Sequence, residues 1–168
     1  MKQKTNMLKL IYSMYDPKWK YTPFPNCIPS IRWGLYGCYA TCLGMFLGKT
    51  PPELITENPH GWDSQGNMAS DSIMRKYGYK IIRTPLVEGH PIPEDQVPCI
   101  LRTSYYNQTD PVTGKFLSGY RMGFPTHFFW YLGKGIIVDP ATSNTKEDID
   151  HRGYLKYCNE RRTLVKTN

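Results

Sequence analysis

A cysteine, a histidine and an aspartate occur in surroundings that suit nucleophilic catalysis. Cys38 follows Gly37 and opens an apolar run that ends at Gly48, a pattern typical of a helix that begins at the cysteine and ends at a C′ glycine. The N-terminus of a helix carries unpaired N–H groups and a partial positive charge, and both stabilise the nucleophilic thiolate. We therefore predict that Cys38 is the reactive thiol among the five cysteines.

His127 and Asp139 follow much later, on a predicted β-hairpin. A three-residue loop, Gly133–Gly135, would place Asp139 opposite Phe129 and diagonal to His127 on the same face, whereas a two-residue loop would place the two side chains on opposite faces. A thiol nucleophile needs a base within hydrogen-bond reach, and the base needs a third group to fix its tautomer and orientation. Cys38, His127 and Asp139 supply these three roles, although a buried structural role for His127 is the competing interpretation.

The remaining cysteines and histidines fit structural roles. Cys42 lies one helical turn beyond Cys38 and is predicted to be core, since most cysteines are small buried hydrophobes. Zinc is the competing functional idea, with Cys38, Cys42 and either Cys27 or a histidine as ligands. A structural zinc site usually has two compact ligand pairs, and the second pair is missing here, so we predict no metal and no cofactor. No functional role is predicted for the others, which are Cys99, Cys158, His60, His90 and His151.

The order of elements predicts an α+β fold in which the nucleophile helix packs on an antiparallel sheet. A polar leader, residues 1–10, is expected before a single domain, residues 11–168. Helices are expected to begin at Cys38, to follow a capping box at Thr50–Glu53, and to cover Met68–Lys76. The predicted strands are Tyr79–Arg83, Cys99–Ser104, Thr126–Leu132, Ile136–Asp139 and Thr163–Lys166, with a loop over Pro85–Pro98 and a turn at Asp110–Gly114.

Composition and charge indicate which classes of molecule this protein could bind. The 168 residues are 40% hydrophobic and 21% charged, with a net charge of +7, which suits an anionic partner such as a cell-wall polymer, an acidic peptide or nucleic acid. The basic residues are scattered, and no phosphate-binding glycine loop, helix-turn-helix or aromatic RNA-binding motif occurs, which argues against nucleic acid. No apolar run approaches a membrane span, and the N-terminal apolar stretch is too short for a signal peptide. We therefore expect synthesis in the cytoplasm, with release to the cell wall depending on other factors.

Several short segments together resemble the bacterial and phage papain-fold cysteine peptidases of the bacteriocin-leader-peptidase-like superfamily. The segments are Ser13–Trp19, Tyr36–Met45, Thr50–Leu54, His127 and Asp139-Pro140, and the resemblance spans about Ile11 to about Pro140. It implies a papain-like fold with Cys38 as nucleophile, His127 as base and Asp139 as its orienting partner.

Met14 departs from the pattern that the resemblance implies. Similar sequences tend to carry at this position a glutamine that helps to form the oxyanion hole, and a methionine side chain cannot donate a hydrogen bond. The backbone N–H of Cys38 could supply one donor. A second would come from the segment before the helix, where Asn26 carries an amide and Trp33 an indole N–H.

The expected function is a cysteine peptidase or amide hydrolase with a Cys-His-Asp triad. Its substrate would be a peptide, with bacterial cell-wall peptide as the endolysin-like case, and acyl transfer to an acceptor other than water would use the same residues. The alternative is a catalytically impaired papain-fold binding module, such as a phage structural protein or an inhibitor of a host protein, and Met14 motivates it.

Overall fold

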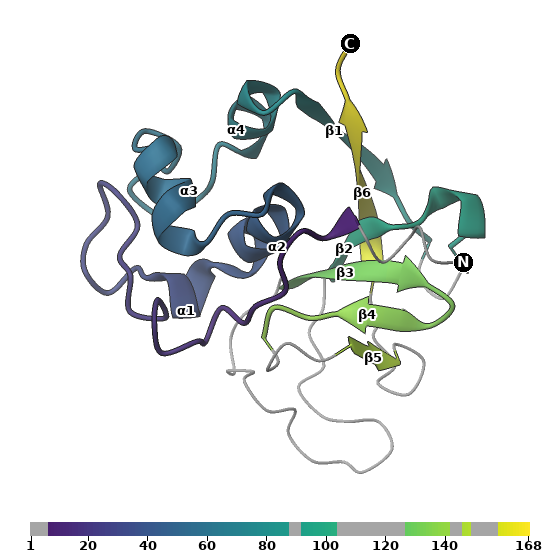
Figure 1. Ribbon diagram of the computed structural model, residues 1–168, viewed down its shortest axis with the longest axis horizontal. Helices are drawn as coiled ribbons and strands as arrows, with labels where there is room; N and C mark the ends of the chain where they lie inside the picture. Colours follow the sequence, from purple (N-terminus) through teal and green to yellow (C-terminus); the bar gives the residue numbers. More distant parts are fainter. Residues whose placement is uncertain (1–6, 88–91, 104–126, 142–145, 149–157) are drawn as a thin grey trace.

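A layer of helices covers one face of an antiparallel sheet in the computed structural model, which describes residues 7–87, 92–103, 127–141, 146–148 and 158–168 (Figure 1). Within these residues the fold is mixed α+β, as predicted. The helices are α1 (Trp33–Tyr36), α2 (Cys38–Leu47), α3 (Pro51–Glu57) and α4 (Ser70–Lys76), and a 3-10 turn covers Glu94–Gln96. The strands are β1 (Tyr79–Pro85), β2 (Cys99–Thr103), β3 (His127–Gly133), β4 (Ile136–Val138), β5 (Lys146–Asp148) and β6 (Cys158–Lys166).

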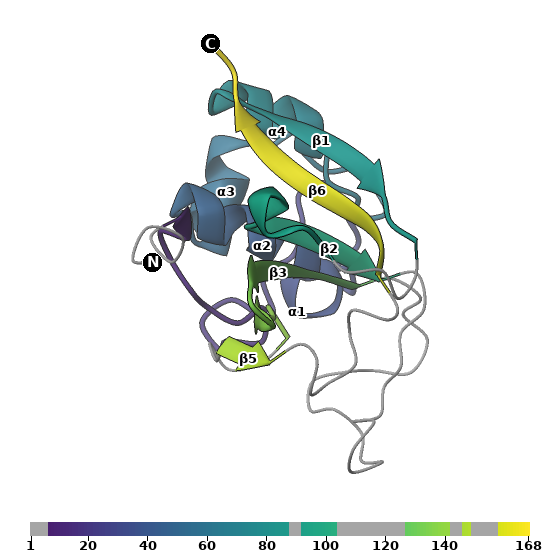
Figure 2. The ribbon, with the colours of Figure 1, turned by 90° about the vertical axis from the view of Figure 1, so that its right-hand side faces the viewer.

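The last strand of the chain occupies an inner position in the sheet. The strand order is β1-β6-β2-β3-β4-β5, and each neighbouring pair is antiparallel. Figure 2 shows β6 running between β1 and β2. The sequence predicted four of these strands with small shifts at their ends and missed β5. It predicted only the last part of β6, which begins at Cys158 rather than at Thr163. The turn expected at Asp110–Gly114 lies outside the described residues.

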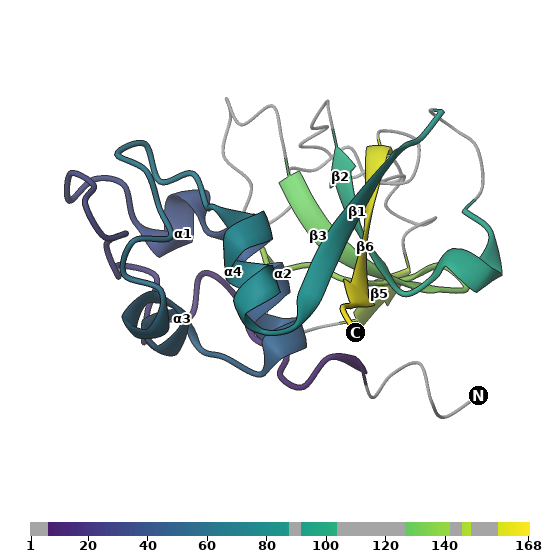
Figure 3. The same ribbon diagram turned by 90° about the horizontal axis from the view of Figure 1, so that it is seen from above.

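The helix α2 packs directly on β3, and this contact is the centre of the main core. The Phe46 ring stacks on Trp130 with centroids 6.0 Å apart, and the Trp130 indole N–H donates to the Cys42 carbonyl at 2.9 Å. Figures 1 and 3 show the four helices on one side of the sheet, with α2 next to it. A second apolar cluster includes alternate residues of β3, among them Phe129 and Tyr131. Burying each large apolar side chain contributes about 1.5–3 kcal/mol.

Local signals set the ends of α2 and the start of α3 as predicted. Gly48 ends α2 in the left-handed conformation, with φ of 73°, which a glycine adopts without steric cost. The Glu53 carboxylate then accepts hydrogen bonds from the backbone N–H and the hydroxyl of Thr50, both at 2.7 Å. This half of a capping box fixes the first turn of α3.

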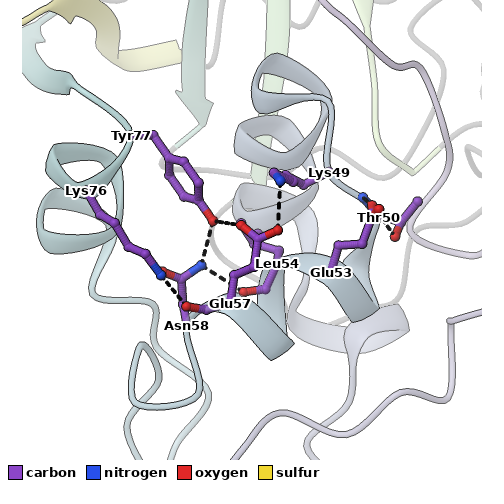
Figure 4. Close-up of polar contacts among 8 residues, drawn as sticks. All are labelled: Lys49, Thr50, Glu53, Leu54, Glu57, Asn58, Lys76 and Tyr77. Atoms are coloured by element: carbon purple, nitrogen blue, oxygen red, sulfur yellow. Dashed lines mark hydrogen bonds and ion pairs between the residues drawn. The ribbon is translucent and has the colours of Figure 1, made fainter.

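A polar cluster at the end of α3 connects it to α4 (Figure 4). The Glu57 carboxylate accepts hydrogen bonds from Lys49 at 2.7 Å and from the Tyr77 hydroxyl at 2.5 Å. Asn58 donates to the Leu54 carbonyl at 2.8 Å and to the Tyr77 oxygen at 3.1 Å. Hydrogen bonds from Lys49 and Tyr77 hold the pKa of Glu57 below its usual range. The cluster therefore keeps α3 and α4 in a fixed relation beside α2.

The described part of the predicted leader packs on α2. Leu8 is buried, and the backbone N–H groups of Lys9 and Leu10 both donate to the Met45 carbonyl, at 2.9 and 3.1 Å. Residues 7–10 thus belong to the packed structure, because they satisfy a carbonyl near the end of α2, where helical partners run out. None of the helices in the described ranges has the length and apolar character needed to cross a membrane.

Candidate active site

Cys38 is the first residue of α2, and the geometry of Gly37 accounts for the start of the helix. Gly37 donates its N–H to the Trp33 carbonyl at 2.8 Å and accepts from the Thr41 N–H at 2.7 Å, so it joins α1 to α2. A Cβ on Gly37 would lie 2.5 Å from the Trp33 carbonyl oxygen and 2.7 Å from its indole ring. Glycine is needed here for close approach rather than for its φ of −85°.

The N–H groups of Cys38, Tyr39 and Ala40 precede the first helical donor of α2, which is Thr41. These groups and the helix dipole favour negative charge on the Cys38 sulfur. The Cys38 side chain is partly exposed, so a reactant can reach it. The remainder of the helix is buried and holds this end in place.

His127 and Asp139 are joined by a buried hydrogen bond. His127 Nε2 lies 2.8 Å from Asp139 Oδ1, and the two residues are only 7% and 1% exposed. The Asp139 carboxylate also accepts the backbone N–H of Ala141 at 2.8 Å. Asp139 therefore holds the imidazole in one orientation, as an orienting group must.

The other ring nitrogen of His127 is directed to the nucleophile. Because Nε2 faces Asp139, Nδ1 is the nitrogen that remains for Cys38, the other side chain that raises the pKa of His127. Burial lowers the pKa of His127, but the charge and hydrogen bond of Asp139 and those of Cys38 outweigh it and raise the pKa to about 10. The imidazolium is thus favoured at neutral pH, next to a thiol at a helix N-terminus.

The hairpin that carries His127 and Asp139 has the predicted register, but its turn differs from the predicted one. The turn is the two-residue Lys134-Gly135, with φ of 53° and 73°, the conformation of a type I′ turn. A bulge in β3 between Tyr131 and Gly133 compensates for the shorter turn, since Tyr131 pairs with Ile137 and Gly133 with Ile136. The prediction of a three-residue loop is therefore wrong.

The consequence for the two side chains is nevertheless the one expected. Beyond the bulge Trp130 pairs with Val138, so Asp139 follows opposite Phe129. The extra residue in β3 cancels the one-residue slip that a two-residue loop would cause.

The segment Ser13–Trp19 holds the strand end that carries Asp139. The Met14 N–H and the Ser13 hydroxyl both donate to the Pro140 carbonyl, at 2.8 and 3.2 Å. The Trp19 indole N–H donates to the Ser13 carbonyl at 2.8 Å. This segment carried part of the resemblance, but the sequence alone gave no reason to expect its contact with Pro140, 127 positions away from Ser13.

The side-chain donors expected for an oxyanion hole are engaged elsewhere. Met14 is buried in the main core, and its backbone N–H is given to Pro140. The Trp33 indole N–H donates to the Thr41 hydroxyl at 2.8 Å inside the core, so Trp33 is not available. Asn26 lies at an exposed turn with φ of 63°, a conformation that asparagine tolerates better than most residues. Asn26 is not among the groups that shift the pKa of His127.

Three of the remaining thiols are buried, whereas Cys38 is partly exposed. Burial raises the pKa of Cys99 to about 12 and also raises the pKa values of Cys42 and Cys158. Cys27 is partly exposed, and its thiol donates to the Asp63 carbonyl at 3.0 Å. His60 is exposed, as predicted, while His90 and His151 lie outside the described residues.

No protein-family model matches the chain, and no curated protein matches it. The arrangement of Cys38, His127 and Asp139 is therefore the main basis for a functional proposal.

Proposed function

We propose that this protein is a cysteine peptidase or related amide hydrolase with a papain-like fold, in which Cys38 is the nucleophile, His127 the base and Asp139 its orienting partner. The observation that carries the proposal is the buried His127–Asp139 hydrogen bond of 2.8 Å, with Cys38 as the other side chain that raises the pKa of His127. A histidine held between a carboxylate and a thiol at a helix N-terminus is the arrangement that thiolate catalysis needs. The papain-like assignment draws support from α2 lying on a strand that begins with His127.

The reaction follows from these positions. The Cys38 thiolate attacks the carbonyl carbon of an amide, and the oxygen that becomes negative accepts the unpaired N–H of Cys38. The His127 imidazolium gives its proton to the leaving amine, which leaves a thioester on Cys38. Neutral His127 then takes a proton from water, and the hydroxide attacks the thioester and displaces the Cys38 thiolate. The carboxylic acid leaves, and the thiolate of Cys38 and the imidazolium of His127 are restored. An amine or alcohol in place of water would complete an acyl transfer by the same route.

We propose a peptide substrate, with cell-wall peptide as the specific case. The net charge of +7 favours approach to an anionic polymer such as the bacterial wall. A single partly exposed thiol beside a buried base suits attack on an extended chain that passes over the helix N-terminus.

The experiment compares hydrolysis by the wild-type protein and by Cys38→Ala, with purified peptidoglycan and with a mixture of short peptides, analysed by mass spectrometry. The matched control is Cys27→Ala, which removes the other partly exposed thiol. We expect new amino groups with the wild type and with Cys27→Ala and none with Cys38→Ala. Equal cleavage by wild type and Cys38→Ala would refute the nucleophile.

A binding module built on the same fold is the second candidate, and the buried Met14 favours it. Loss of one oxyanion donor typically lowers kcat by about 10²–10³. Met14→Gln tests this, because glutamine restores a donor at nearly the same volume. A large gain in hydrolysis from a wild type without measurable activity would support the binding module, whereas an active wild type would exclude it.

A further inference from the structure

An aromatic and arginine cluster adjoins the candidate active site. Tyr39 directly follows Cys38, and Phe128 directly follows His127, and their ring centroids are 4.6 Å apart. The guanidinium carbon of Arg162 lies 4.5 Å from the Tyr39 centroid and 4.6 Å from the Phe128 centroid. Contacts of this kind between a cation and aromatic rings hold a guanidinium in a fixed place. Because Tyr39 and Phe128 are the chain neighbours of Cys38 and His127, this positive charge is held near the candidate active site, on the face of the sheet that α2 covers.

A second arginine extends this positive charge along the sheet. Arg102 on β2 pairs with Phe128 on one side and with Glu160 on the other, so these side chains share the face that α2 covers. The Glu160 carboxylate is already bound to Arg162, with Oε1 2.5 Å from Nε. Among the described residues, Arg102 has no ion-pair partner of its own. This face thus retains one positive charge that Glu160 does not balance.

The hydroxyl of Tyr39 provides an independent observation. It is buried and has no hydrogen-bond partner in the described structure. Most buried polar atoms in native proteins are hydrogen-bonded, so an unpaired phenol requires an explanation such as a bound ligand. The phenol O–H of Tyr39 and the guanidinium that lies over its ring both have donors that a carboxylate accepts.

We propose that Tyr39, Phe128, Arg102 and Arg162 form a carboxylate-binding subsite, and that the substrate is an acidic peptide with a carboxylate close to the scissile amide. The inference deepens the proposed function and rests on it. The guanidinium N–H groups of Arg162 and Arg102 and the hydroxyl of Tyr39 would donate to the carboxylate, and the two rings would cover its methylene groups.

The first test reads the charge beside Cys38 without any knowledge of the substrate. Iodoacetate and iodoacetamide are nearly the same size and differ by one negative charge, so the ratio of their alkylation rates at Cys38 reports the local potential. The ratio is measured by mass mapping of the modified cysteine in the full-length protein. We expect Arg162→Gln and Arg102→Gln each to lower it about threefold, the effect of removing one unit charge at about 10 Å across a partly solvated surface.

Arg161→Gln is the matched control. Arg161 is the next residue along β6, its side chain reaches Thr84, and its loss changes the net charge by the same amount. In Arg161→Gln, and in Arg162→Lys, which keeps the charge, the ratio of alkylation rates should equal the wild-type ratio within experimental error. An unchanged ratio in both Arg162→Gln and Arg102→Gln, or an equal fall in Arg161→Gln, would overturn the subsite. Circular dichroism spectra of each variant establish that it is folded.

The second test distinguishes the two sources of a carboxylate. Acetyl-Ala-Glu and acetyl-Ala-Gln acyloxymethyl ketones compare an acidic side chain with its neutral amide in labelling Cys38. Tri-alanine and its C-terminal amide compare a terminal carboxylate with its amide as inhibitors of iodoacetamide labelling. The subsite is supported if the wild-type protein prefers the acid over the amide in either pair, and if this preference is lost in Arg162→Gln and kept in Arg161→Gln. The pair that shows the preference identifies the ligand. Preference in neither pair would overturn it.

The failure of the proposed function gives a different result. In that case Cys38→Ala would still hydrolyse peptides, or Cys38 would be alkylated no faster than a cysteine in the unfolded chain. The ratio of the two alkylation rates remains measurable at a slow thiol with longer reaction times. The carboxylate-binding subsite and the role of Cys38 as nucleophile are therefore tested by separate measurements.

Discussion

Replacing Asp139 with asparagine removes one negative charge from a buried position and leaves the size of the side chain almost unchanged. The charge it faces is the imidazolium of His127, whose Nε2 lies 2.8 Å from Asp139 Oδ1. Burial alone lowers the pKa of His127, and Asp139 and Cys38 together raise it to about 10. The variant keeps the contribution of Cys38 and loses that of Asp139.

The size of the change follows from the distance. The charge centres of a hydrogen-bonded imidazolium and carboxylate are about 4 Å apart, which corresponds to about 4 kcal/mol at an effective dielectric constant of about 20. At about 1.4 kcal/mol per pKa unit, this is about three units. We therefore expect the pKa of His127 to fall from about 10 to about 7 in Asp139→Asn. Hydrolysis should fall by about 10²–10⁴ at neutral pH, chiefly because asparagine no longer fixes the tautomer and orientation of the imidazole.

The assay is an NMR titration of protein labelled at histidine, with the His127 signal assigned by its absence in His127→Gln. The control is Asp71→Asn, since Asp71 is a half-exposed carboxylate bound to Arg83 and is not among the groups that shift the pKa of His127. We expect no shift of the His127 midpoint in that variant. A midpoint that moves by less than one unit in Asp139→Asn would refute the reasoning, because the hydrogen bond would then not stabilise the imidazolium.

Four further outcomes follow from the same contacts. Iodoacetamide near pH 7 should modify Cys38 before the other four cysteines, since burial raises the pKa values of three of them, and mass mapping that finds Cys27 first would contradict this. Gly37→Ala should lower the free energy of unfolding by about 1–3 kcal/mol in urea titrations and slow the labelling of Cys38, because its Cβ would overlap the Trp33 carbonyl. The pKa of His127 is raised in the folded state, so protonated His127 adds its full contribution to the free energy of unfolding below about pH 6.5 and loses it as the pH rises towards about 10. The difference in unfolding free energy between wild type and His127→Gln should therefore shrink over that range. Elemental analysis of the purified protein should find no stoichiometric zinc, and loss of circular dichroism signal on chelation would contradict this prediction.

Local rules in the sequence set the helix that carries Cys38. Gly37, Gly48 and the pair Thr50 and Glu53 each act within a few residues of their own position, through close approach, a positive φ and a capping box. These effects depend on neighbouring residues alone, so the pattern of residue types was enough to place α2 and the start of α3. The candidate nucleophile could be named from the sequence for this reason.

The oxyanion side of the site could not be predicted in the same way. Trp33 was expected as a possible donor, but a second residue of the core, Thr41, takes its indole N–H at 2.8 Å. Whether a donor is available depends on what packs against it, and the spacing of residues along the chain does not contain that information.

The sequence by itself determined the residue types of the candidate site and the local elements that present them. Only the tertiary structure decided how these elements meet. The bulge in β3 keeps Asp139 beside His127, and the Ser13 hydroxyl donates a hydrogen bond to the Pro140 carbonyl. The inner position of β6 in the sheet brings Arg162 against Tyr39. Each of these contacts joins residues that are distant in sequence or depends on a one-residue shift between strands. Their free energy comes from burying shared apolar surface and pairing backbone groups across the sheet, and both depend on all the strands and helices packing together.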